Sequence, residues 1–324
     1  MRHLLRHHHA MWLVSFLLLL VALPAFGAGV SFEPRPLSSE AYGESYTAIA
    51  DFSDGSFALL QYVFSNAGVG DGKAACRALV VKPDKAALNE VVRVDREQWS
   101  YQAVGNRLTV GKCVLDSTGK QTRFVAHTEN ARVELVFARK PDLIRPPGGV
   151  VQVDDEEFYA GDIVVPWAVV RGKITMNKVT TTSEGMGYMD HTRSNTRLPK
   201  IASRWLRFRG LSGAKKTLME IRYSPEGKAQ GWQWVEGKAA PEKIDLTGLR
   251  LSAQANALSF SIGAHRVSTS ELLYSYEPVK EWGFVGWLAK PWVGNPETRT
   301  FRATLALADG QEIRGILEES RLQN

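Results

Sequence analysis

Histidine and cysteine are scarce in this chain of 324 residues. It has two cysteines and seven histidines, and only His127, His191 and His265 lie beyond the first 28 residues. Metal centres are built mainly from histidine, cysteine and carboxylate ligands, so a histidine-built site is hard to assemble here. No CxxC pattern is present either. We therefore expect no metal and no other cofactor.

Several signatures of nucleotide, metal and hydrolase chemistry are also missing. The sequence has no phosphate-binding glycine loop, nucleophile elbow, HExxH motif or EF-hand pattern. Without residues 1–28 the formal net charge falls from +6 to +4, because two arginines and no acid are removed. Nucleic-acid binding usually needs a concentrated basic face, so we expect no nucleic-acid partner. Weak attraction to anionic lipid headgroups stays open.

The N-terminus has the features of a signal peptide. Two arginines precede an apolar run at residues 11–23, which is short for a membrane span. Ala25 and Gly27 fit the small-x-small cleavage pattern, and Ala28 is a second choice. We therefore predict that residues 1–28 are removed near Gly27 or Ala28, which leaves a periplasmic or secreted protein.

The two cysteines, Cys76 and Cys113, have two interpretations. In an oxidising compartment they form one disulfide. Alternatively they are separate buried thiols, which is a common environment for free cysteine. The sequence spacing alone does not show whether the two Cα atoms come close enough for a bond.

The remaining chain is typical of an all-β protein. Short apolar or alternating runs, separated by glycine, asparagine and serine turns, predict strands at residues 46–52, 57–64, 73–81, 91–94, 98–104, 107–115, 123–127 and 132–137. A second series begins at Trp205 and continues at 217–223, 231–235, 257–262, 266–276, 300–306 and 312–317. Strands of this length and regularity indicate a sandwich or a barrel. Two similar series in tandem indicate two related barrels, at residues 29–200 and 201–324.

The segment between the two series departs from this regular pattern. A proline- and glycine-rich loop is expected at residues 141–149, inside the first half. Residues 163–174 predict a long strand, which Pro166 makes an edge strand or a bent one. Residues 183–200 are predicted to be a polar loop.

This predicted loop carries the densest group of candidate catalytic residues. Gly185 and Gly187 permit tight backbone geometry. Tyr188 and Asp190 are two residues apart and share one face of an extended chain, and His191 adds a third acid/base group. If Asp190 faces an apolar cavity, desolvation raises its pKa, and it can donate a proton to a carbon–carbon double bond.

The same residues also have a structural interpretation. Asp190 can pair with Arg193 or Arg204 and pin the loop that joins the two halves, since arginine–carboxylate pairs are common structural clasps. A single histidine such as His191 is more often a hydrogen-bonded polar residue than a proton shuttle.

Aromatic residues gather near the C-terminus among glycine and proline, at Trp282, Phe284, Trp287 and Trp292. Their spacing is too interrupted for a helix or a regular strand. One interpretation is a lid or a peripheral membrane contact, because tryptophan and the flanking lysines suit a lipid interface. The other is a loop that closes the end of the second barrel.

A family resemblance accompanies these patterns. Residues 46–55, 58–66 and 74–81 resemble the opening of the fungal survival-factor family, whose members are tandem lipocalin-like proteins linked to ceramide handling. Residues 198–205 resemble the junction between the halves of those proteins. Residues 185–191 resemble the glycine–aspartate motif of the related hydroxyneurosporene synthase (carotenoid hydratase) and AttH-type proteins. The motif here continues with Thr192-Arg193-Ser194, where that branch has an aromatic residue and glycine.

This resemblance implies two tandem lipocalin-like (calycin) barrels, packed side by side, with an apolar cavity. It implies a hydrophobic ligand in contact with Trp167, Tyr188, Asp190, Arg204 and Trp205. The first hypothesis is an exported protein that binds or transfers an apolar lipid, either sphingolipid-like or isoprenoid. The second is a polyene hydratase, cyclase or isomerase with Asp190 as proton donor, and the third is a structural envelope protein.

Overall fold

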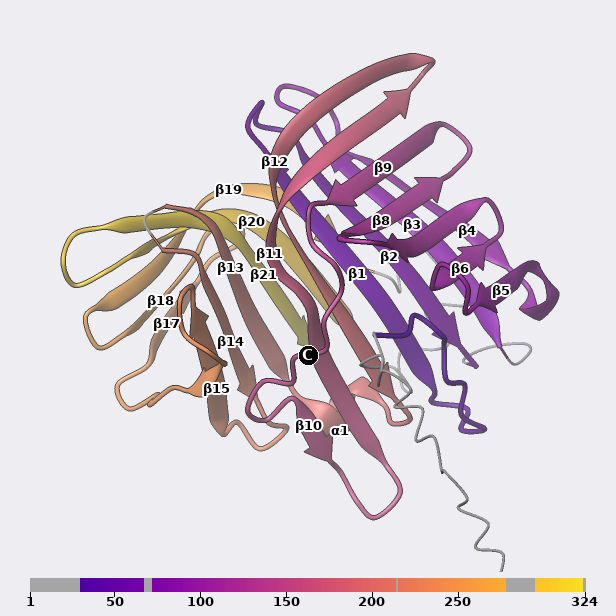
Figure 1. The fold of residues 1–324 in the computed structure, drawn as a ribbon. Helices are drawn as coiled ribbons and strands as arrows, with labels where there is room; N and C mark the ends of the chain where they lie inside the picture. Colours follow the sequence, from indigo (N-terminus) through magenta and orange to yellow (C-terminus); the bar gives the residue numbers. More distant parts are fainter. Residues whose placement is uncertain (1–29, 67–71, 214, 278–294, 323–324) are drawn as a thin grey trace, which may run out of the picture.

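Two antiparallel β-sheets make up nearly all of the structure. The computed structural model describes residues 30–66, 72–213, 215–277 and 295–322. One sheet has twelve strands and the other has nine. The two curved sheets lie side by side, the first as a nearly closed barrel and the second as a half-barrel (Figure 1). The all-β prediction with two tandem lipocalin-like barrels is confirmed.

The first sheet runs in the order β4-β3-β2-β1-β12-β11-β9-β8-β7-β6-β5, with β10 paired to β11. Its strands are β1 (Gly43–Phe52), β2 (Phe57–Ser65), β3 (Lys73–Val81), β4 (Leu88–Val94), β5 (Trp99–Gln102), β6 (Arg107–Val110), β7 (Cys113–Thr118), β8 (Gln121–His127), β9 (Ala131–Phe137), β10 (Val150–Gln152), β11 (Phe158–Met176) and β12 (Val179–Ser194). A short 3-10 helix, Arg96–Gln98, precedes β5.

The second sheet runs in the order β16-β15-β14-β13-β21-β20-β19-β18-β17. Its strands are β13 (Arg204–Gly213), β14 (Thr217–Tyr223), β15 (Ala229–Val235), β16 (Glu242–Lys243), β17 (Arg250–Ala253), β18 (Leu258–Ile262), β19 (His265–Tyr276), β20 (Pro296–Ala306) and β21 (Glu312–Leu322). The single turn of helix α1 (Leu198–Ile201) joins the two sheets. Among the described residues, no helix has the length and apolar character needed to cross a membrane.

The interior of the first barrel is filled by side chains. Successive residues of a strand point to opposite faces, so alternate positions of β1 to β3 face inward. Tyr46, Tyr62, Phe64 and Phe124 belong to this buried apolar cluster and are at most 1% exposed. Cys76 on β3 and Cys113 on β7 form a disulfide across this interior, with their Cα atoms 6.5 Å apart. The bond joins strands that are not neighbours in the sheet.

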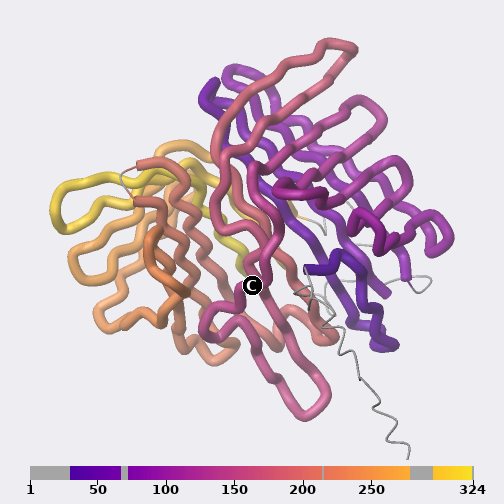
Figure 2. Tube along the Cα trace, viewed as in Figure 1, coloured from indigo at the N-terminus to yellow at the C-terminus, as the bar shows by residue number. Residues whose placement is uncertain are grey.

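The outer face of the same strands packs against the second sheet. Ile49, Leu59 and Tyr188 from the first sheet form one buried cluster with Trp232 and Ile316 from the second. The chain trace in Figure 2 shows the two halves side by side. The first strands are therefore apolar on both faces, which explains their nearly continuous hydrophobic sequence.

The prediction of a polar loop at residues 183–200 is wrong. Residues up to Ser194 belong to β12, which pairs with β1 on one side and β11 on the other. The close backbone approach of β1 explains the two glycines, because a Cβ at Gly185 would meet the carbonyl oxygen of Asp51 and one at Gly187 would lie 2.7 Å from that of Ile49. The segment is polar because one of its faces meets the second sheet at a group of charged residues.

Pro166 lies in a bent strand rather than at a sheet edge. Strand β11 is central, between β12 and β9. Its register with β12 shifts between Ile163 and Val165 and again between Val165 and Ala168. A bulge accommodates a residue without a backbone N–H, so the proline sits where the ladder is already interrupted.

Candidate functional site

A cavity of about 270 Å³ lies between the two sheets. The first sheet contributes one wall through the outer faces of β1, β2, β3 and β12, and the second contributes the other through β13, β19, β20 and β21. The expectation from sequence was a cavity inside a barrel, whereas this cavity lies between the two sheets. Its volume is close to the lower end of the usual range for small-molecule sites.

The wall of the first sheet is divided into a polar and an apolar row. Asp190, Thr47, Gln61 and Arg77 lie directly opposite one another on β12, β1, β2 and β3. The Gln61 side-chain amide donates to the hydroxyl of Thr47 at 3.1 Å. The neighbouring row on the same face consists of Tyr188, Ile49, Leu59 and Leu79. Of this apolar row, Leu59 and Leu79 line the cavity beside the polar row, whereas Tyr188 and Ile49 pack in the apolar contact between the sheets.

The wall of the second sheet supplies two arginines, the buried Arg209 and the partly buried Arg207. Residues of β13 alternate, so that Leu206 and Phe208 enter the core of the second sheet while Arg207 and Arg209 face the first sheet. The side chain of Arg209 is only 4% exposed. A guanidinium that is so deeply buried needs carboxylate partners, because an unpaired charge at this depth is costly.

Five charged side chains form a connected group at this wall. Arg209 Nη2 donates to Asp190 Oδ2 at 3.2 Å, and Arg209 Nη1 lies 3.8 Å from Glu318 Oε2. Arg207 Nη1 donates to Glu318 Oε1 at 3.1 Å, and Arg207 Nε donates to Glu220 Oε2 at 3.0 Å. Asp190 thus connects strand β12 to the arginines of the second sheet.

Neighbouring charges and burial shift the carboxyl groups of this site in different directions. Besides Arg207 and Arg209, Arg77 acts electrostatically on Glu318 and Arg222 acts on Glu220. Burial raises the pKa of Asp190 above its ordinary value, and Glu318 adds to this, although Arg209 and Arg207 oppose it. Burial also acts on Glu318, but Arg209 and Arg207 outweigh it and lower its pKa.

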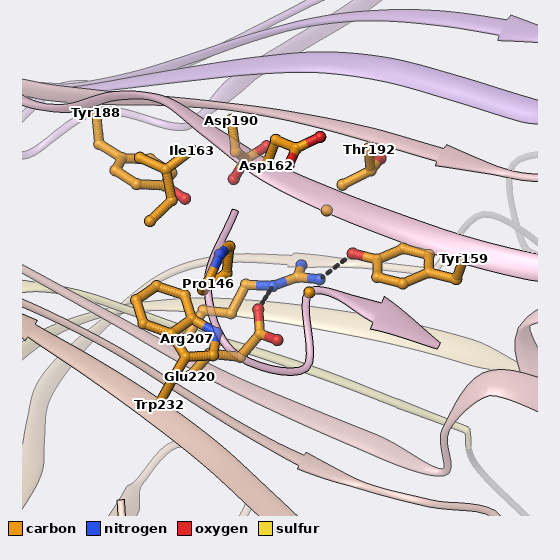
Figure 3. Close-up of a pocket in the computed structure, with 12 residues that line it drawn as sticks. Pro146, Tyr159, Asp162, Ile163, Tyr188, Asp190, Thr192, Arg207, Glu220 and Trp232 are labelled. Atoms are coloured by element: carbon orange, nitrogen blue, oxygen red, sulfur yellow. Dashed lines mark hydrogen bonds and ion pairs between the residues drawn. The ribbon is translucent and has the colours of Figure 1, made fainter. Parts of the chain in front are cut away.

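Two tyrosines flank Asp190. The ring of Tyr188 lies under the Arg209 guanidinium, 4.8 Å from its carbon, and burial together with Asp190 raises the tyrosine pKa well above its usual value. The hydroxyl of Tyr159 accepts a hydrogen bond from Arg207 at 3.3 Å, and burial raises its pKa to about 12. Both phenols are therefore protonated at neutral pH. Figure 3 shows Tyr188, Asp190 and Tyr159 around one pocket with Arg207 and Glu220 opposite.

His191 does not line this site, so the structure does not bring it together with Tyr188 and Asp190 as the sequence predicted. Neighbouring residues of a strand point to opposite faces, and His191 stacks on Tyr46 on the barrel side of β12. Its Nε2 lies 2.8 Å from Oε1 of buried Glu44. Burial alone would raise the pKa of Glu44, but hydrogen bonds from His191, the Arg35 backbone and Tyr42 lower it.

The predicted clasp exists, but with a different arginine. Arg193 lies beside Glu44, with Nε 3.9 Å from Oε2, and Arg204 pairs with Glu319 on the inner face of the second sheet. Asp190 instead pairs with Arg209, because residues 205, 207 and 209 of β13 face the first sheet and residue 204 does not.

Of the other residues predicted to contact a ligand, one lines the cavity and two do not. Trp205 lines the main cavity and is 6% exposed. Arg204 faces away from it, toward Glu319. Trp167 packs on Trp234 of the second sheet, with ring centroids 4.9 Å apart, in the apolar contact between the sheets.

The proposed lid residues Trp282, Phe284, Trp287 and Trp292 lie outside the described residues. Within the described part of the chain, no group of three or more histidine, cysteine or carboxylate side chains is arranged to hold a metal ion. Sequence reasoning missed Arg207, Arg209, Glu220 and Glu318 as site residues. The alternation of charged and apolar residues at 206–209 was the available signal.

Three comparisons place this fold among known proteins. No family model matches the sequence, and no curated protein does. Among solved structures, an AttH-type protein from Nitrosomonas europaea superposes with a TM-score of 0.63 at 10% identity, covering 92% of this chain and 98% of that one. Kievitone hydratase from Nectria haematococca gives 0.54 at 14% identity, over 86% and 88%.

A third structure, CghA bound to Sch210972, gives a TM-score of 0.50 at 11% identity and covers 88% of this chain and 89% of that one. Each likeness extends over most of both chains. These likenesses confirm that the chain has the same fold as the AttH-type protein, kievitone hydratase and CghA.

Proposed function

We propose that this protein is an acid catalyst that protonates a carbon–carbon double bond of a small, partly apolar substrate held between the two sheets. Asp190 is the proton donor. The observation that carries the proposal is the position of Asp190, which lines both cavities, is only 13% exposed and pairs with the buried Arg209. A neutral carboxylic acid in this position can give up its proton and leave a carboxylate that Arg209 stabilises.

The chemical step needs no cofactor. The Asp190 O–H bond breaks, a C–H bond forms at one alkene carbon, and positive charge develops at the other. In a hydration, water forms a C–O bond with that carbon and returns its extra proton to Asp190. In a cyclisation, a second double bond forms the new C–C bond, and loss of a C–H proton restores Asp190. Both routes return the enzyme to its starting state.

The walls of the cavity support a substrate with an apolar chain and a polar end. The apolar side chains of Leu59 and Leu79 can bury an alkene, and each buried CH₂ contributes about 0.8 kcal/mol. The polar row of Thr47, Gln61 and Arg77 would face oxygen atoms of the substrate. The name of kievitone hydratase adds support by analogy of fold.

Carriage of an apolar lipid receives less support, although it was the first hypothesis from sequence. Arginine side chains beside the cavity would have to lose water against a purely apolar ligand, which is unfavourable. We also propose that the protein is exported to the periplasm or secreted. The Cys76–Cys113 disulfide supports an oxidising compartment.

The test is incubation of purified mature protein with geraniol and farnesol, followed by organic extraction and mass spectrometry. We expect a hydrated or cyclised product that depends on enzyme concentration. Recovery of both compounds unchanged, together with a stoichiometric lipid extracted from the purified protein, would contradict the proposal and favour a carrier. If no product forms and no lipid is extracted, the result would favour the structural envelope role.

A further inference from the structure

A second, much smaller cavity adjoins Asp190. Its volume is about 30 Å³, and it shares Tyr159, Asp190, Thr192 and Arg207 with the main cavity. The loop that precedes β10 covers it through Pro146 and Gly149. A volume of this size has room for about one or two water molecules and is too small for an organic substrate.

The walls of this satellite cavity carry the polar groups that a bound water needs. Across β13, β14 and β15, Arg207, Glu220 and Trp232 lie directly opposite one another and face the first sheet. The indole N–H of Trp232 has no hydrogen-bond acceptor among the described residues, although its side chain is only 6% exposed. A buried donor without an acceptor is unfavourable, and in folded proteins such a group usually bonds to an ordered water.

Figure 3 shows that Trp232 and Asp190 line the same pocket. Tyr188 and Asp190 extend from the first sheet, and Trp232, Glu220 and Arg207 lie across the pocket from them. A water there could accept from the indole N–H and donate to the carboxyl or hydroxyl oxygens that line the same small space, and Arg207 offers further N–H donors. Two to four such partners are typical of an ordered buried water.

We infer that the satellite cavity is a built water site that supplies the nucleophile for hydration. This inference rests on the proposed function and adds the co-substrate and the place from which it attacks. Once Asp190 has transferred its proton to the alkene, the water oxygen forms the C–O bond. The extra proton of the water returns to the Asp190 carboxylate, so alkene and water give an alcohol with no other reactant.

A crystallographic test needs no substrate. Electron density at high resolution should show an ordered water within hydrogen-bond distance of Trp232 Nε1 in the wild-type protein. In Gly161→Ala, the added methyl carbon would lie 3.1 Å from the Tyr159 hydroxyl, at the wall of the satellite cavity, and should displace that water. An empty satellite cavity in the wild type would overturn the inference.

A kinetic test compares two matched tryptophans of β15. Trp232 and Trp234 are both 6% exposed, but the N–H of Trp234 already donates to the carbonyl of Lys238 at 2.9 Å. The assay incubates farnesol with enzyme in water enriched in oxygen-18 and measures the ratio of labelled alcohol to products that have not added water. Trp232→Phe should lower this ratio by about tenfold, because one hydrogen bond to the attacking water is lost. Trp234→Phe should leave that ratio unchanged.

The outcomes separate this inference from the proposed function. If the wild type converts farnesol only to isomerised or cyclised products without label, proton donation stands and the water site is wrong. If neither variant changes the product ratio, the water site is also wrong. If no product forms at all but the crystal shows the water, the proposed function fails, and with it the role of the water as nucleophile, which leaves only a structural water.

Discussion

Replacement of Asp190 by asparagine separates a catalytic role from a structural one. Asparagine has the same shape, keeps an oxygen that can accept the hydrogen bond from Arg209, and has no acidic proton to transfer. A charge-assisted hydrogen bond contributes about 1.5–3 kcal/mol and a neutral one about 1 kcal/mol. The variant should therefore lose at most about 2 kcal/mol, partly offset because no carboxylate has to be desolvated.

The structure offers a matched control in Asp51→Asn. Asp51 on β1 pairs with Arg302 of the second sheet, with Oδ1 2.6 Å from Nη1, so it is also a carboxylate that joins the two sheets. The exposed fractions of the two aspartate side chains are similar, at 19% for Asp51 and 13% for Asp190. Asp51 does not line the described cavities, so only its structural contribution is lost.

The assay measures turnover of farnesol beside thermal unfolding for both variants. The unfolding midpoints should fall by no more than about 4 °C. Product formation by Asp190→Asn should fall by about 100-fold or more, the usual contribution of a general acid, and that by Asp51→Asn should stay near the wild-type rate. Equal losses of turnover in the two variants would refute the reasoning, because Asp190 would then be only a clasp.

Three further results are expected. Replacing both Cys76 and Cys113 with alanine removes the disulfide that closes a loop of 37 residues, and it should lower the free energy of unfolding by about 4 kcal/mol in urea titrations. An unchanged urea midpoint of unfolding would contradict this. Gly185→Ala places a methyl group against a backbone carbonyl of β1 and should cost about 1–3 kcal/mol in thermal unfolding, whereas Gly43→Ala meets no atom within 4 Å and should be neutral. Because the pKa of Glu44 is lowered, the carboxylate stabilises the fold above the ordinary value of 4.5, and that stabilisation is lost as the pH falls through the folded-state pKa. The stability difference between wild type and Glu44→Gln should therefore disappear in acid, and a difference independent of pH would refute this.

Local sequence patterns were enough to predict the architecture. The alternation in β1 to β3 and the turn glycines come from the chain's own neighbourhood, and they indicated strands that the structure contains. The same patterns failed at β12. Its polar residues resemble a loop when taken alone, because the arginines that satisfy them, Arg207 and Arg209, come from a different sheet.

The candidate site was predictable only in part for the same reason. Spacing placed Tyr188 and Asp190 on one face, and the structure has both at the cavity. His191 was included because it is adjacent in sequence, although an extended chain turns it to the opposite face. Arg209 and Glu318 are brought to Asp190 only by the packing of the two sheets, which no local pattern encodes.

The protonation state of Asp190 tests the central claim most directly. Carbon-13 NMR of labelled aspartate, with Asp190→Asn to assign the signal, would follow this carboxyl through a pH titration of the free protein. The account predicts a titration midpoint clearly above the ordinary value of 3.8. A midpoint at or below that value would mean that Arg209 and Arg207 keep Asp190 ionised, and it would contradict proton donation from this residue.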